Sequence, residues 1–128
     1  MGIMTALKEE LKEASILFRR VNSHRGENIL GFNFRKFGAD FGVYDFDEFV
    51  EKARGFYREA ANSGDPGFSV VDLPDGRKAI DKDGEMRGIF NEEGEPIAFF
   101  RPDFRELGYD DKEQELADFR AGKYYTVA

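Results

Sequence analysis

The sequence predicts an α+β domain over residues 1–128, in which two N-terminal helices pack on a four-stranded antiparallel β-meander and a short C-terminal helix follows. Two stretches with helical apolar spacing come first, and four short apolar segments joined by tight turns come next. Connections this short join only antiparallel neighbours, so the four segments are expected to be consecutive strands. A length of 128 residues with 41% hydrophobic content suits a single domain.

The two N-terminal helices follow from apolar residues that recur every three or four positions. Thr5 is placed to cap the first helix, which is expected to end in the polar segment 22–26. Asp45 followed by Glu48 resembles a capping box and predicts the start of the second, which ends at 62–67. Between them, residues 30–41 alternate phenylalanine with glycine and charge, and we interpret them as a short strand or packed loop.

The predicted strands are residues 68–73, 78–80, 86–90 and 97–101, and each connector contains a glycine beside an acidic residue. Alternation along the third strand places Arg87 and Ile89 on the face opposite Met86, Gly88 and Phe90. Asp110 or Asp111 begins the last helix, which ends near Ala121. The expected core combines both helices with the sheet: Leu11, Phe18, Phe49, Ala53, Phe56, Ile80, Phe90 and Phe99.

Composition restricts the function classes. The chain carries 26 acidic and 19 basic side chains, a net charge of −7, whereas nucleic-acid binders are usually basic. This acidity fits either simple solubility or a basic protein partner. The absence of cysteine excludes disulfides and thiolate metal sites. No apolar run approaches the roughly 20 residues that span a bilayer, and no secretory signal is expected at the N-terminus.

Three segments in order suggest a family. They are Lys-Phe-Gly-Ala-Asp-Phe-Gly at 36–42, Asp-Gly-Arg-Lys at 75–78, and the hairpin at 87–103, which ends in Phe-Phe-Arg-Pro-Asp. Over residues 32–103 the chain resembles the C-terminal ribonuclease toxins of the barnase/EndoU/colicin-type superfamily. The resemblance implies metal-independent, cofactor-free cleavage of RNA and an immunity protein as partner. It also implies a cytoplasmic site of action, reached from a larger secreted effector or a phage-related element.

RNA cleavage without a metal needs a base, an acid, and cations that stabilise the charged phosphorane. The histidine of the resembled family falls on Phe37, and its threonine or serine falls on Ala98, so neither group is present. The remaining candidates are Arg77, Arg101 and the single histidine, His24, for catalysis, and Lys36, Lys78, Arg87 and Tyr109 for substrate binding. Each has a plain alternative as a solvated or packed side chain. The paired carboxylates suit turns and caps, and we expect no metal.

Two hypotheses remain open. The first is a ribonuclease-toxin-like domain that acts on RNA. The second is a non-catalytic acidic protein on the same fold that binds and inhibits another protein, for example a phage-encoded anti-defence protein. A fold does not decide between them, because function depends on the site.

Overall fold

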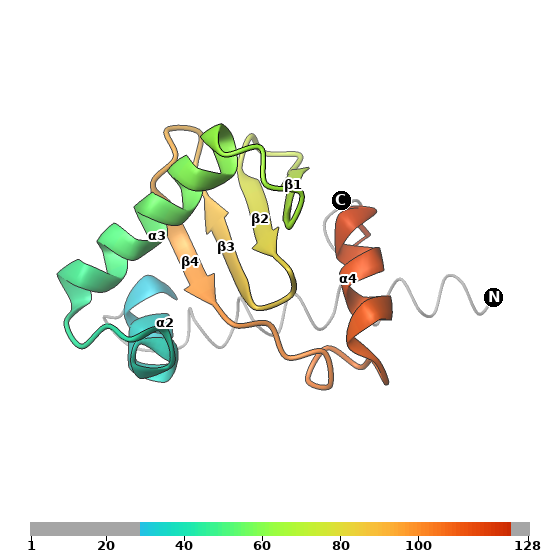
Figure 1. Cartoon of the computed structure of the whole chain (residues 1–128), viewed down its shortest axis with the longest axis horizontal. Coiled ribbons are helices and arrows are strands. Elements are labelled where there is room, and N and C mark those ends of the chain that lie inside the picture. The colour runs from blue at the N-terminus through green and yellow to red at the C-terminus, as the bar shows by residue number, and fades with distance from the viewer. Residues whose placement is uncertain (1–28, 124–128) are drawn as a thin grey trace.

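The computed structural model describes residues 29–123 of the chain. The first predicted helix, His24, and the expected core residues Leu11 and Phe18 lie outside this range. The described chain is an α+β fold, in which helices precede a four-stranded antiparallel sheet and a short helix follows it (Figure 1). The elements are α2 (Ile29–Phe37), the 3-10 turn η1 (Ala39–Phe41), α3 (Phe46–Asn62), β1 (Phe68–Asp72), β2 (Lys78–Lys82), β3 (Met86–Phe90), β4 (Pro96–Phe100) and α4 (Lys112–Arg120).

The interpretation of residues 30–41 as a strand or loop is wrong, because most of the segment is α2 and η1. Leu30, Phe34 and Phe37 recur at helical spacing, and all three contribute to packing on the sheet. The buried side chain of Asn33 accepts a hydrogen bond of 3.0 Å from the backbone N–H of Phe99 in β4. This contact with β4 outweighs the low helix propensity of the glycine in the segment.

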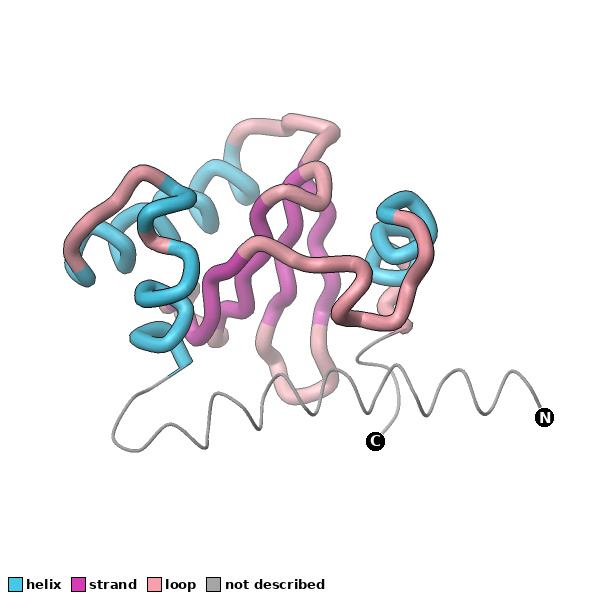
Figure 2. Tube along the Cα trace, turned by 90° about the horizontal axis from the view of Figure 1, so that it is seen from below, coloured by secondary structure: helices cyan, strands magenta, loops and turns pink. Residues whose placement is uncertain are grey.

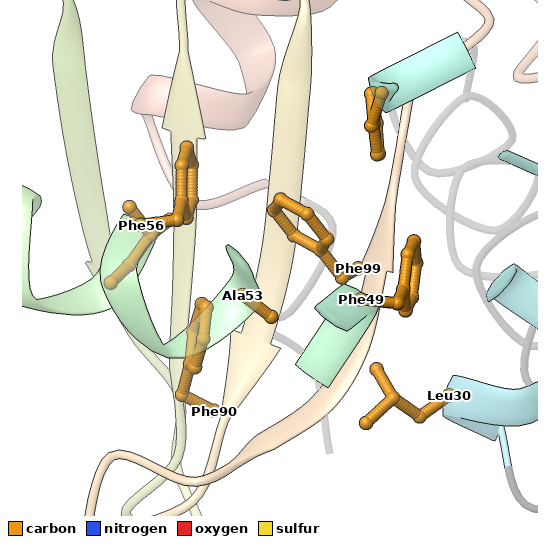
Figure 3. Close-up of a cluster of buried hydrophobic side chains, with 8 residues drawn as sticks. Leu30, Phe49, Ala53, Phe56, Phe90 and Phe99 are labelled. Atoms are coloured by element: carbon orange, nitrogen blue, oxygen red, sulfur yellow. The ribbon is translucent and has the colours of Figure 1, made fainter. Parts of the chain in front are cut away.

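Helix α3 confirms the predicted start and end. Asp45 is its N-cap, and its carboxylate accepts a hydrogen bond of 2.9 Å from the backbone N–H of Glu48. The buried face of α3, which carries Phe49, Ala53 and Phe56, meets Phe90 and Phe99 of the sheet (Figure 3). All six expected core residues within the described range belong to this cluster: Phe49, Ala53, Phe56, Ile80, Phe90 and Phe99.

The sheet has the predicted meander order β1-β2-β3-β4, with each neighbouring pair antiparallel. The β2–β3 turn places both Asp83 (φ 55°) and Gly84 (φ 71°) in the left-handed region. The backbone N–H of Glu85 closes this turn by donating a hydrogen bond of 2.9 Å to the carbonyl oxygen of Lys82, and glycine at position 84 adopts the positive φ without strain.

The two faces of the sheet are covered differently. Helices α2 and α3 lie on one side and α4 lies on the other, as the view in Figure 2 shows. Asp111 caps α4 by accepting a hydrogen bond of 3.0 Å from the backbone N–H of Gln114. On the α4 side a second apolar cluster forms around the fully buried Phe119: Val71, Leu73, Ala79, Ile89, Ala98 and Phe100. Across residues 29–123, no helix is long and apolar enough to cross a membrane.

Candidate functional site

A pocket of about 290 Å³ lies at one end of the sheet. Four parts of the chain form it: the end of α2, the β2–β3 turn, the segment that follows β4, and the start of α4. Because these parts are far apart in sequence, the pocket exists only in the folded chain. Its lining residues are Phe37, Gly84, Glu85, Arg101, Pro102, Asp103, Phe104, Lys112 and Glu115.

Most charged groups in the pocket lining already have partners. The ammonium of Lys112 lies 2.5 Å from a carboxylate oxygen of Glu85, and this hydrogen bond lowers the pKa of Glu85. The carboxylate of Asp103 accepts a hydrogen bond of 3.0 Å from the backbone N–H of Arg105. Within the described range, Arg101 is the lining cation with no carboxylate at ion-pair distance, and its guanidinium carbon lies 5.8 Å from the centroid of the Phe41 ring.

Arg87 lies behind the pocket in a buried ionic cluster. Its Nε donates to Asp81 (2.9 Å), and its two Nη atoms donate to the two carboxylate oxygens of Glu115 (2.7 and 2.9 Å). Its guanidinium carbon lies 4.1 Å from the centroid of the Phe119 ring, close enough for a cation–π contact. The side chain is only 2% exposed. The predicted role of Arg87 in substrate binding requires an exposed side chain on the strand surface. The observed burial does not fit that role.

Burial and charge act in opposite directions on the pKa values of this cluster. Burial raises the pKa of Asp81 above its usual value, although the charge of Arg87 opposes this shift. Burial by itself would lower the pKa of Arg87. The hydrogen bonds and charges of Glu115 and Asp81 outweigh that effect, so the pKa of Arg87 is raised and the guanidinium stays charged.

The structure separates Arg77 from Arg101, the two arginines predicted to act together. The register aligns Arg87 with Phe100 and Lys82 with Met86, so Arg101 lies at the end of the sheet that carries the β2–β3 turn. Arg77 precedes β2 and therefore lies at the opposite end. At about 3.3 Å per residue, five residues along β2 place the two levels roughly 15 Å apart. Arg77 therefore does not line the pocket that contains Arg101.

The basic residues beside the β1–β2 turn form local pairs. The guanidinium of Arg77 donates to Asp75 (2.6 Å), and the ammonium of Lys78 donates to Asp72 (2.6 Å). The hydrogen bond to Asp72 raises the pKa of Lys78. These contacts hold Arg77 and Lys78 to the hairpin, away from the pocket.

The other two predicted binding residues lie in different surroundings. The ammonium of Lys36 lies 5.3 Å from the centroid of the Phe37 ring and 4.0 Å from Glu106, so it flanks the pocket. The hydroxyl of Tyr109 donates a short hydrogen bond of 2.6 Å to Asp118 beside the second apolar cluster. Of the predicted site residues that the structure describes, Arg101 lines the pocket and Lys36 lies next to it.

The resembled family carries its reactive groups at two positions, and in this chain these positions lie in different surroundings. Phe37 lines the pocket together with Arg101. Ala98 is 3% exposed within the second apolar cluster. Sequence reasoning missed the pocket residues Glu85, Phe104 and Lys112. The sequence did predict the Asp-Gly turn that precedes Glu85 and the helix cap that precedes Lys112.

Two comparisons bear on the family. No protein-family model and no curated protein matches the chain. The likeness to ribonuclease toxins therefore stays a hypothesis that rests on the motifs within residues 32–103. In the part of the chain from 29 to 123, no three His, Asp or Glu side chains are grouped so that they could hold a metal ion.

Proposed function

We propose that this chain is a non-catalytic protein-binding domain on a ribonuclease-toxin-like fold. The observation that carries the proposal is the closed sheet face around Ala98. In the resembled toxins a hydroxyl side chain at this position serves the reaction. Here Ala98 is 3% exposed and packs in the same cluster as Ile89 and the fully buried Phe119 of α4. An RNA strand could reach this position only if α4 moved away.

The arrangement of cations supports the same proposal. A phosphorane carries concentrated negative charge, and its stabilisation needs donors placed together around one position. Arg87 is committed to two buried carboxylates, and Arg77 lies at the other end of the sheet. Of the two arginines predicted to act in catalysis, Arg101 lines the pocket and Arg77 does not. The net charge of −7 also repels RNA and favours a basic protein surface.

One observation favours the ribonuclease hypothesis as a second candidate. Phe37 and Arg101 are 64 residues apart in sequence, yet both line the same pocket. This is the juxtaposition expected if the motifs of the hairpin and of segment 36–42 derive from one ancestral site. Phe37 carries no group that exchanges a proton, so the second candidate requires a base from elsewhere.

An RNA-cleavage assay on the full chain tests the choice. We expect no cleavage of a labelled RNA by the chain as written, by Arg101→Ala, or by Arg77→Ala, which serves as the matched control outside the pocket. Cleavage that Arg101→Ala abolishes and Arg77→Ala retains would contradict the proposal.

The binding half of the proposal needs a separate measurement. Proteins recovered with the tagged chain are identified, purified and tested for direct association at increasing salt concentration. We expect one of them to form a defined complex that weakens as salt screens the acidic surface. Failure of every purified candidate to bind directly would contradict the protein-binding role.

A further inference from the structure

The pocket has apolar walls and a size that suits one ring. Phe37, Pro102 and Phe104 contribute its apolar surface, and each is only partly buried, so this surface is open to an incoming group. Its volume of about 290 Å³ is at the lower end of the range for small-molecule sites. A pocket of this size takes a single side chain more readily than an extended ligand.

The charges around the pocket do not select an anion. Glu85 is paired with Lys112, and Glu115 is held by both Nη atoms of Arg87. The two other charged lining residues are Asp103, which is negative, and Arg101, which is positive. The same Arg87 also pairs with the buried Asp81, so the charges around the pocket do not sum to a positive value, and a nucleotide phosphate gains little net attraction here. A neutral ring that enters needs no counter-charge and can receive the guanidinium of Arg101 on its face.

We infer that this pocket anchors one aromatic side chain of a protein partner, with the ring against Phe37 and Phe104 and Arg101 at its rim. The inference rests on the proposed protein-binding function and names the part of the surface that performs it. Aromatic side chains that fill a partner's pocket dominate the binding energy of many interfaces. A polar rim that surrounds the anchor and excludes water is the usual arrangement, and Glu85, Asp103 and Lys112 supply it here.

The probe for this site is N-acetyl-tryptophanamide, titrated into the isotopically labelled full chain. The chain contains no tryptophan, so indole fluorescence reports the probe alone. We expect saturable amide shifts confined to residues around the pocket, with a dissociation constant in the millimolar range. Phe104 belongs to neither apolar cluster, so Phe104→Ala should keep the fold and weaken probe binding about fivefold or more.

Tyr44→Ala is the matched control, because Tyr44 is an aromatic side chain that is 79% exposed and does not line the pocket. It should leave probe binding unchanged. Thermal melts of both variants show whether each one is folded. Probe binding that Tyr44→Ala reduces as much as Phe104→Ala, or the absence of saturable shifts at the pocket, would overturn the inference.

A parallel titration with uridine 5′-monophosphate separates the two classes of ligand. We expect this nucleotide to bind more weakly than the indole probe. Tighter nucleotide binding that Arg101→Ala abolishes would overturn the anchor site in favour of an RNA site. The cleavage assay stays independent of these titrations, so loss of the anchor site alone leaves the non-catalytic proposal standing.

Discussion

The two faces of the sheet are held by different physical means. Toward α3, aromatic rings meet: the centroid of the Phe99 ring lies 5.1 Å from that of Phe41, 5.5 Å from that of Phe49 and 5.3 Å from that of Phe56. Toward α4, a smaller apolar cluster around Phe119 adjoins the buried Arg87, Asp81 and Glu115. One face is stabilised by apolar burial, and the other combines apolar burial with a buried ionic cluster.

This difference predicts how each face responds to change. Apolar burial has little directional requirement, so a residue of similar size restores much of the lost stability. A buried ion pair depends on geometry, because desolvation costs several kcal/mol per ion and is offset only by complete pairing. In the described range, every buried side-chain N or O atom has a hydrogen-bond partner. Loss of one member of the ionic cluster should therefore affect the others.

The largest effect is expected for Arg87→Met. It leaves Asp81 and Glu115 buried without their cation and should lower the free energy of unfolding by about 3–5 kcal/mol. Arg87→Lys should recover little, because one ammonium cannot replace three directed donors. Urea denaturation measures both, with Arg54→Met as the control for an exposed arginine that also contacts two carboxylates. A stable Arg87→Met variant would show that the ionic cluster does not hold α4.

The aromatic face is tested by Phe56→Ala, which should cost about 3–5 kcal/mol through lost burial and a residual cavity. Phe56→Leu should recover most of this loss, in contrast to Arg87→Lys. Thermal melts of the two Phe56 variants measure these losses, and Tyr44→Ala provides an exposed aromatic control. Equal losses for Phe56→Leu and Phe56→Ala would mean that ring geometry, and not burial, stabilises this face.

Asn33→Ala probes the join between α2 and β4. The substitution leaves the backbone N–H of Phe99 without its acceptor in a buried position and should cost about 1–3 kcal/mol. Asn62→Ala removes an exposed amide that bonds to the Arg58 carbonyl oxygen and should change stability far less. The comparison uses urea denaturation. Similar values for the two variants would contradict a stabilising role for the Asn33 contact.

The smallest effect concerns pH. Burial would raise the pKa of Asp118, but hydrogen bonds from Tyr109, Lys123 and Gln114 outweigh it, so the pKa lies below its usual value. Stability from a lowered carboxylate pKa is present above the pKa of the unfolded chain, about 4, and is lost as pH falls through the lower folded value. Tyr109→Phe should cost about 1 kcal/mol at neutral pH.

The same reasoning sets the outcome in acid. As pH falls through the lowered pKa of Asp118, the carboxylate becomes protonated, and the difference between Tyr109→Phe and the unchanged chain should shrink. Denaturation curves at neutral and acidic pH measure it. A difference that grows in acid would mean that the hydrogen bond does not favour the ionised carboxylate.

The elements whose signals are local follow from sequence patterns alone. Asp45 as the cap of α3, the Asp83-Gly84 turn, and the alternation of Arg87 with Phe90 each depend on residues a few positions apart. Backbone geometry and side-chain periodicity act over this range, so sequence patterns report them directly. The six expected core residues of the α3 cluster followed from the same periodicity.

Which of these elements meet, and therefore where the candidate site lies, depends on the folded arrangement of the whole chain. From the sequence, Arg87 was expected to be a surface cation. In the structure both of its Nη atoms donate to Glu115, which lies 28 residues later in the chain. From the sequence, residues 30–41 were interpreted as a strand or loop. In the structure most of them are helical, and Asn33 of this segment accepts a hydrogen bond from β4. Arg101 faces the pocket while Arg77 does not, because strand register places them at opposite ends of the sheet. The pairing of side chains between elements, and the face of the sheet that each element covers, depend on contacts between distant residues, which local patterns do not encode.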